Sequence, residues 1–313
     1  MTLKEKIIKI ASLTLCAAVV TAGCVFGARA YKKNHIEYTV ADTLEDGGGR
    51  EATVILIGGQ SNASGCSLNE YLERNVSEEK YAEYKSGPDN VYINHLSVEN
   101  ASGGFVKCVP GQGETDEMFG LELGLAEKLH ELYPERTFFI IKCAWGNTDL
   151  FEKWLSPSSE GETGVLYKHF VEFVETNLEY LESKNYKINV AAMCWMQGES
   201  DSFEIANSEN YGERTANLVN DLRGEFDEYN NGEGILFVDA YIAENPMYWV
   251  YYEGVNRGKA EVAASSPLNV IVETSHLITT NEPEDNPDVP HYDSMSEIEL
   301  GHLFAEKIAA FIG

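Results

Sequence analysis

Ser61 lies in a glycine-rich segment, GGQSNASG (residues 58–65), that directly follows the apolar run 53–57. A serine between the end of a strand and the start of a helix exposes its hydroxyl group, and nearby backbone N–H groups point at whatever it attacks. The segment is not the G-x-S-x-G elbow of the α/β-hydrolases, because Gln60 and Asn62 flank the serine. It also lacks the G-x-G-x-x-G and GK[ST] patterns of nucleotide-binding loops. The segment therefore predicts a nucleophilic serine.

Two further segments place polar groups after apolar runs. The segment CAWGNTDL (143–150) offers Gly146, whose backbone N–H can lie close to a ligand. The segment WMQGESD (195–201) brings Gln197 and Glu199 to the end of another run. A side-chain amide at such a position can donate a hydrogen bond to a developing oxyanion.

Asp288 and His291 have D-x-x-H spacing in DNPDVPHYDS (285–294), just before the last helical stretch. One turn can hold both side chains, so that the carboxylate accepts a hydrogen bond from the imidazole and fixes its tautomer. A single histidine or a single QGE triplet is usually an ordinary surface feature. Four such segments at one predicted edge together favour a catalytic site.

The rest of the pattern indicates which elements position these segments. Short apolar, β-branched runs alternate with stretches of helical spacing. The expected strands are Thr53–Ile57, Val91–Ile93, Thr137–Cys143, Ile188–Met196 and Ile235–Ala240, with a weaker one at Asn269–Glu273. The expected helices lie near 118–132, 165–184, 208–229, 252–264 and 295–312.

Strands that alternate with helices imply a parallel sheet covered on both faces. The sequence therefore predicts an α/β fold, a three-layer α/β/α sandwich with a central parallel sheet of about five strands. In such folds, ligands bind where loops leave the carboxyl ends of the strands. Three of the four segments with candidate catalytic residues directly follow an expected strand, and the fourth, 285–294, precedes the last expected helix.

The first 33 residues differ from the rest of the chain. Three lysines precede an uncharged apolar run, residues 10–28, and three basic residues follow it. This pattern predicts an export signal or membrane anchor over residues 1–33. We therefore expect an extracellular protein, secreted or anchored at the surface of a bacterial cell. Thr21-Ala22-Gly23-Cys24 resembles a lipoprotein box without its usual aliphatic residue, so cleavage, lipidation at Cys24 and retention stay open.

Residues 34–50 are polar and glycine-rich and predict a linker, and residues 51–313 are the expected folded domain. Residues 34–313 carry 17 basic and 50 acidic side chains, a net charge of −33. Such a surface repels nucleic acid and anionic lipid. We therefore expect no nucleic-acid partner, and membrane contact only through the N-terminal segment. No cysteine spacing indicates a metal site.

These segments resemble a known family. GQSNASG, WMQGESD and DVPHYD are similar to signature blocks of the SGNH/GDSL hydrolase superfamily, specifically its sialate O-acetylesterase and acetylxylan esterase branch, carbohydrate esterase family 6. Residues 120–129 and 146–154 resemble two further family stretches, so the resemblance spans about 53–312. It implies a flavodoxin-like α/β/α sandwich and hydrolysis of acetylated oligo- or polysaccharide through an acyl-enzyme, without a metal or organic cofactor.

The resemblance also implies roles for individual residues. Ser61 corresponds to the nucleophile and His291 to the general base. The backbone N–H groups of Ser61 and Gly146 and the side chain of Gln197 correspond to the oxyanion hole.

The acid that orients His291 is open between Asp288, which fits the D-x-x-H pattern and is favoured, and Glu199, which would otherwise brace the serine loop. The residues expected to touch substrate are Gln60, Asn62, Trp145, Asn147 and Trp154. Trp145, Trp154 and Tyr167 offer a face for stacking a sugar, with core packing as the alternative.

Two departures from the family leave the substrate open. Trp145-Gly146-Asn147 stands where paired glycines are common, and Ala63 stands where methionine often follows GQSN. A lipase or thioesterase of the same superfamily is one alternative, which acyl chain-length preference would distinguish. A non-catalytic carbohydrate-binding surface protein is another, although a binding protein would have no need of the serine, histidine and acids.

Overall fold

The computed structural model describes residues 38–279, 282–285 and 288–313, and Thr39–Gly313 form one compact unit. The export signal or anchor predicted for residues 1–33 lies outside the described residues. Within the described part of the chain, no helix combines the length and apolar character that a membrane crossing requires.

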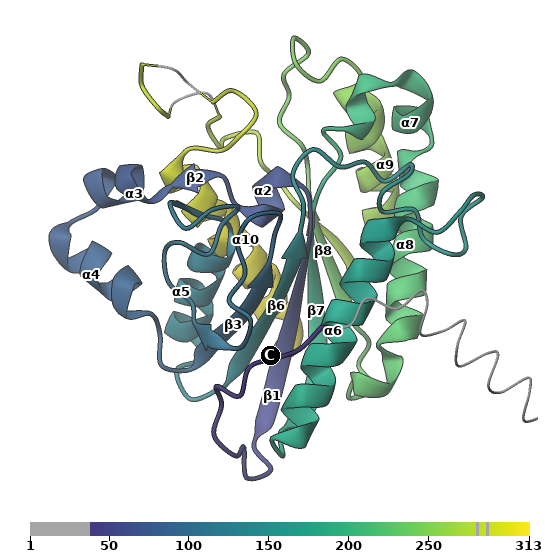
Figure 1. The fold of residues 1–313 in the computed structure, drawn as a ribbon. Coiled ribbons are helices and arrows are strands. Elements are labelled where there is room, and N and C mark those ends of the chain that lie inside the picture. The colour runs from purple at the N-terminus through teal and green to yellow at the C-terminus, as the bar shows by residue number, and fades with distance from the viewer. Residues whose placement is uncertain (1–37, 280–281, 286–287) are drawn as a thin grey trace, which may run out of the picture. The chain divides into compact units, whose positions relative to one another are not determined.

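A seven-stranded sheet forms the core of this unit (Figure 1). Its strands, from one edge to the other, are β4 (Val106–Lys107), β3 (Val91–Leu96), β6 (Phe138–Ala144), β1 (Glu51–Gly59), β7 (Lys187–Met196), β8 (Leu236–Ala240) and β9 (Asn269–Val272). All neighbours pair in parallel except β3 and β4. The sheet exceeds the expected five strands because the weak sixth run pairs with β8 and because β4 adds an antiparallel edge.

The central strands are apolar because both of their faces are covered. Every residue of β6 is buried, and so is every residue of β1 after Glu51. Parallel strands that carry helices on both sides have this near-continuous hydrophobic character. The pattern that predicted these strands is thus a direct consequence of their position in the sheet.

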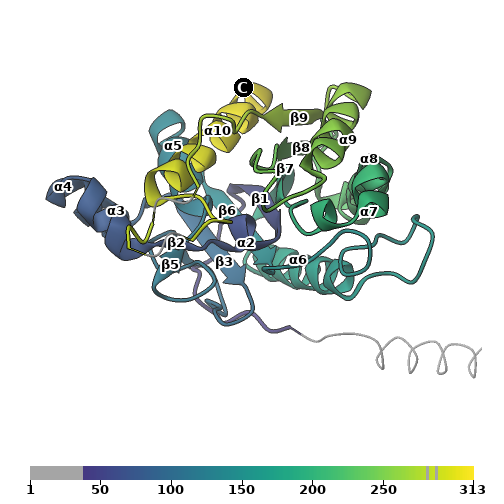
Figure 2. The same ribbon diagram turned by 90° about the horizontal axis from the view of Figure 1, so that it is seen from above.

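Helices cover both faces of the sheet (Figures 1 and 2). One face carries α6 (Val165–Ser183), α8 (Tyr211–Glu225) and α9 (Tyr252–Ser265); the other carries α5 (Glu122–Leu132) and α10 (Ser294–Ile312), which pack against each other. This arrangement confirms the predicted three-layer α/β/α sandwich.

Several local elements differ from expectation. The helix expected over 208–229 is divided into α7 (Ile205–Glu209), α8 and a 3₁₀ turn, Asp227–Tyr229. The helix expected from residue 118 begins at Glu122, because Met118–Phe119 form β5, which pairs with β2 (Ser67–Leu68). Two short helices, α3 (Asn69–Asn75) and α4 (Glu78–Ser86), were not expected.

The chain order of the strands creates the site. Strand β1 lies between β6 and β7, and the chain builds one side of the sheet before the other. Counted in chain order, the parallel strands are arranged 2-3-1-4-5-6, which differs from the 2-1-3-4-5 order of flavodoxin. Both orders leave a crevice at the carboxyl ends of the strands beside the first strand, where ligands bind in such folds.

The described part of the predicted linker is attached to the domain. Ala41 N–H donates to Gly103 O at 2.8 Å, and Gly47 N–H donates to Lys184 O at 2.6 Å. The N–H groups of Thr43 and Leu44 both donate to the Tyr180 hydroxyl at 3.1 Å. The compact unit therefore begins at Thr39, before the boundary expected at residue 51.

Candidate active site

Ser61 is the first residue of α2 (Ser61–Ser64), a single helical turn at the end of β1. Gly59 makes this turn with a φ of 137°, a region that L-residues with side chains rarely adopt. A β-carbon at Gly59 would also overlap the carbonyl oxygen of Met196. The sharp turn places the Ser61 N–H at a helix start, where backbone N–H groups have no intrahelical partner.

His291 and Asp288 form a hydrogen-bonded pair in the loop before α10. The distance from His291 Nδ1 to Asp288 Oδ2 is 2.6 Å. The loop is anchored by Asp293, whose side chain accepts from Ser296 N–H at 2.8 Å and caps α10. The hydrogen bond to Asp288 fixes Nδ1 of His291 toward the carboxylate and leaves Nε2 for proton transfer.

Asn62 joins the serine loop to the histidine loop. Its Nδ2 donates to Glu199 Oε1 at 2.9 Å and to Pro290 O at 3.4 Å, and its Oδ1 accepts from Tyr292 N–H at 3.4 Å. The side chain is buried, so it holds the site together instead of contacting the substrate as predicted.

One cavity of about 360 Å³ gathers most of the predicted site. The predicted residues that line it are Gln60, Ser61, Gly146, Asn147, Glu199 and His291. Asp288 reaches this group through its hydrogen bond to His291. The nucleophile thus lies more than 200 residues before its base and acid in the sequence.

Among the described residues, the side-chain hydrogen bond of Glu199 comes from Asn62 and not from His291. Burial raises the pKa of Glu199, although the Asn62 hydrogen bond and the charges of Lys259 and His291 lower it in part. Its Oε2 is buried and has no hydrogen-bond partner among the described residues. The geometry therefore pairs Asp288 with the histidine and gives Glu199 the bracing position.

Gln197 lies outside the cavity, contrary to its predicted place in the oxyanion hole. The residue is fully buried, and its Nε2 lies 2.6 Å from Asp201 Oδ2, 3.0 Å from Thr148 O and 3.3 Å from Gln60 Oε1. Its Oε1 accepts from the Tyr211 hydroxyl at 3.0 Å. An amide nitrogen has two hydrogens, so this one is fully used in joining three loops.

The predicted aromatic side chains do not line the cavity: Trp154 and Tyr167 are core residues, and Trp145 is half-buried. Trp154 is 1% exposed, and its ring packs edge-on against Trp195 at 5.1 Å. The Trp145 ring lies 5.7 Å from the His169 ring. Neither tryptophan lines the cavity, and Tyr167 is also buried. Core packing and sugar stacking call for the same side chains, so the sequence pattern did not separate them.

Gln60 lines the cavity but is also a structural residue. Its Oε1 accepts from Gly198 N–H at 3.3 Å and from Ser200 N–H at 3.2 Å, so it fixes the loop after β7 against the serine loop. Asn147 is exposed in the cavity wall, with a φ of 55° that asparagine tolerates well.

Six cavity residues were not predicted: Glu114, Ser200, Phe203, Tyr248, Trp249 and Pro290. Ser200 and Pro290 are neighbours of predicted residues in the same motifs. Glu114, Tyr248 and Trp249 belong to irregular connections and Phe203 to the 3₁₀ turn Asp201–Phe203, where no periodic pattern points to a site. The glycines on both sides of Gln112 were the one available signal for an ordered loop near Glu114.

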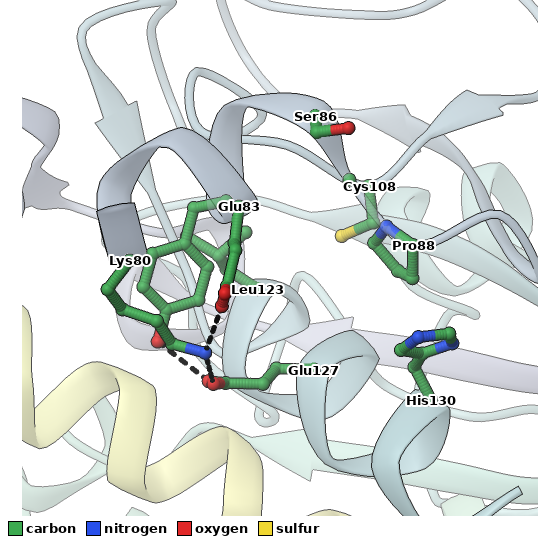
Figure 3. A pocket seen from close by; sticks show the side chains of 10 residues that line it. Lys80, Glu83, Ser86, Pro88, Cys108, Leu123, Glu127 and His130 are labelled. Carbon is green, nitrogen blue, oxygen red and sulfur yellow. Dashed lines mark hydrogen bonds and ion pairs between the residues drawn. The ribbon is translucent and has the colours of Figure 1, made fainter. Parts of the chain in front are cut away.

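A second hollow, of about 410 Å³, lies between α4 and α5 (Figure 3). Lys80 Nζ lies 2.5 Å from Glu127 Oε1 and 3.0 Å from Glu83 Oε2, and the Tyr84 hydroxyl donates to Glu127 Oε2 at 2.6 Å. These polar groups satisfy one another. Cys108 and His130 also line the hollow, but the Cys108 thiol donates to Glu122 O at 3.4 Å and His130 Nδ1 lies 2.6 Å from Asn90 Oδ1.

The four described cysteines are free thiols, so Cys66 and Cys108 do not form a disulfide. Among the described residues, no three histidine, cysteine or acidic side chains gather in a way that would hold a metal ion.

Comparison with known proteins identifies the family. The sequence profile described as carbohydrate esterase, sialic acid-specific acetylesterase, matches residues 51–310. The chain belongs to this family. It is therefore a carboxylic ester hydrolase of the carbohydrate acetylesterase type, as the sequence motifs predicted, and the family implies acetylated carbohydrate substrates.

Solved structures share the fold at low sequence identity. A protein from Arabidopsis thaliana aligns with a TM-score of 0.59 at 19% identity, over 82% of this chain and 98% of its own. NanS aligns with a TM-score of 0.61 at 16% identity, over 84% and 98%. A carbohydrate acetylesterase from Xanthomonas citri aligns with a TM-score of 0.57 at 14% identity, over 83% and 56%. No curated protein sequence matches the chain.

Proposed function

We propose that this esterase removes O-acetyl groups from carbohydrate through an acetyl-enzyme on Ser61. The observation that carries the proposal is the single cavity that both Ser61 and His291 line, with Asp288 bonded to the histidine at 2.6 Å. A serine, a histidine and an orienting carboxylate are the components of serine hydrolysis on several unrelated folds.

In the first half of the reaction, His291 Nε2 removes the Ser61 proton as the oxygen attacks the acetyl carbonyl carbon. The tetrahedral intermediate then collapses, and the sugar oxygen leaves with the proton from His291. In the second half, His291 takes a proton from a water molecule that attacks the acetyl carbon, and it gives this proton to Ser61 Oγ as acetate leaves. Asp288 stabilises the imidazolium that forms in each half.

The oxyanion is held by the backbone N–H groups of Ser61 and Gly146 in this proposal. Both residues line the cavity. Gln197 contributes indirectly, because its amide donates to the Thr148 carbonyl and thereby holds the loop that carries Gly146. A donor to an oxyanion typically accelerates the reaction by roughly 100- to 1000-fold.

The test is acetate release from acetylated xylan and from O-acetyl sialic acid by the wild-type protein and by Ser61→Ala. Activity of the wild type on either substrate, and a loss of roughly 1000-fold or more in the variant, is the expected result. Equal activity of Ser61→Ala would contradict the proposed nucleophile. A preference for 4-nitrophenyl octanoate over the acetate ester would instead favour a lipase-type activity.

We also propose that the enzyme acts outside the cell, because of the basic and apolar pattern of residues 1–33. Fractionation of bacteria expressing the full chain tests this. Recovery of the protein from the cytoplasmic fraction alone would overturn the proposal.

A further inference from the structure

The cavity of the proposed esterase site has one acidic wall. Glu114 comes from the long connection between β3 and α5 and lines the cavity together with Ser61 and Gly146. A β-carbon at Gly146 would lie 2.9 Å from Glu114 Oε1 and 3.1 Å from Oε2. The carboxylate therefore lies directly beside the glycine whose N–H is proposed to hold the oxyanion.

The position of this carboxylate is fixed by its neighbours. Glu114 Oε2 accepts from the Cys66 thiol at 3.1 Å and from the Ser64 hydroxyl at 3.5 Å. Its backbone N–H donates to Gly65 O at 2.8 Å. Cys66, Ser64 and Gly65 all follow the nucleophile directly, so Glu114 is held by the serine loop itself.

In the described part of the chain, no lysine or arginine side chain compensates this charge at the cavity wall. None of the described residues that line the cavity is lysine or arginine. Lys259 lies behind the wall, but its side chain is fully buried and its Nζ is 2.6 Å from Asp239 Oδ1. A carboxylate on a bound sugar would therefore meet Glu114 without a positive partner, and like charges brought together at a binding site are unfavourable.

The remaining lining fits an uncharged sugar. Phe203 and Tyr248 line the cavity and are 52% and 41% exposed, and Trp249 lies beside them in the lining. Aromatic side chains present large apolar faces, and the free Glu114 oxygen can accept a hydrogen bond from a sugar hydroxyl.

We propose that Glu114 is a specificity-determining residue that makes the enzyme select acetylated sugars without a carboxylate and disfavour anionic ones such as sialic acid. This inference rests on the proposed esterase function and narrows its substrate class.

The test compares O-acetyl sialic acid with its methyl ester, because the two differ in the carboxylate charge and share the sugar. We expect kcat/KM for acetate release to be at least about tenfold higher for the methyl ester with the wild-type enzyme. In Glu114→Gln, which keeps the shape and removes the charge, this ratio should fall at least about threefold. Glu117→Gln is the matched control: it removes a charge from the same loop, but its side chain is exposed and outside the cavity, so the ratio should stay unchanged.

The outcomes separate the two proposals. Cleavage of 4-nitrophenyl acetate that Ser61→Ala abolishes, combined with equal or faster turnover of the free acid, would overturn the specificity inference alone. An unchanged ratio in folded Glu114→Gln, as judged by its melting temperature, would also overturn it. Absence of cleavage of every ester by the folded wild type would overturn the esterase function, and the specificity inference with it.

Discussion

At the scale of single residues, the site contains two acidic side chains whose surroundings indicate different roles. Asp288 is 44% exposed and bonded to His291, whereas Glu199 is buried and bonded to Asn62. A carboxylate bonded to the histidine ring can stabilise the positive charge that forms on that ring. A buried one that accepts from a side-chain amide mainly holds that amide in place.

Asp288→Asn should therefore lower kcat by roughly 100- to 10,000-fold, because the amide no longer selects the correct histidine tautomer. Glu199→Gln keeps an oxygen that can accept from Asn62, so we expect it to lower kcat by less than about tenfold. Steady-state kinetics of both variants, with their melting temperatures as a check of folding, decides between the two acids. A larger loss in Glu199→Gln would transfer the orienting role to that residue.

At the scale of elements, the turn from β1 into α2 depends on a residue without a side chain. Gly59 has a φ of 137° and lies against Met196 of the neighbouring strand. Gly59→Ala should lower the free energy of unfolding by roughly 2–4 kcal/mol, because backbone strain and overlap add together. Gly224→Ala is the matched control: Gly224 lies in α8 with no heavy atom near its β-carbon position, so alanine there should be neutral or stabilising by up to about 1 kcal/mol. Denaturant titrations in which both variants behaved alike would contradict this explanation of the turn.

The sequence predicted the buried elements of the fold better than its irregular connections. The strands of the central sheet were found because they are buried on both faces and therefore apolar throughout. The motifs around Ser61 and His291 were found because each has unusual local spacing. Glu114 was missed because nothing in the irregular connection between β4 and β5 predicts which carboxylate lies beside the serine loop. Gln197 was misplaced because a sequence shows that an amide is near a strand end, but not which acceptors occupy its hydrogens.

A second element-scale feature is the contact that joins α4, α5 and α10. Glu127 of α5 is bonded to Lys80 and Tyr84 of α4 and to His302 of α10. Burial acts to raise the pKa of Glu127, but the hydrogen bonds from His302, Lys80 and Tyr84 outweigh it and lower the pKa to about 2.

A carboxyl group whose pKa is lowered in the folded state stabilises that state above its unfolded pKa and ceases to do so as the pH falls. The free energy of unfolding should therefore decline in part through Glu127 between about pH 4.5 and pH 2. Glu127→Gln should cost on the order of 2 kcal/mol at pH 7 and progressively less below pH 4.5. Glu131→Gln, which removes an exposed carboxylate from the same helix, should cost less than about 0.5 kcal/mol at every pH. A constant cost for Glu127→Gln from pH 7 to pH 2.5 would contradict the charge-based explanation.

At the scale of the whole molecule, the charge of the domain acts in the same direction as Glu114 but over a longer range. Residues 34–313 carry a net charge of −33, and such a field repels anions before they reach the cavity. Mobile ions screen this field, since the Debye length falls from about 30 Å at 0.01 M salt to about 8 Å at 0.15 M. The repulsion of an anionic substrate should therefore weaken as salt is added.

We expect kcat/KM for O-acetyl sialic acid to rise several-fold between about 0.01 and 0.15 M salt, whereas kcat/KM for its methyl ester should stay constant. The slope of this salt dependence should be nearly the same in Glu114→Gln, because one charge among many contributes little to the long-range field. The short-range preference at the cavity and the long-range repulsion are thus separable: the variant changes the first and salt changes the second. A decrease of the sialic acid rate with salt would mean that the substrate is attracted on approach, which the charge distribution of this domain does not support.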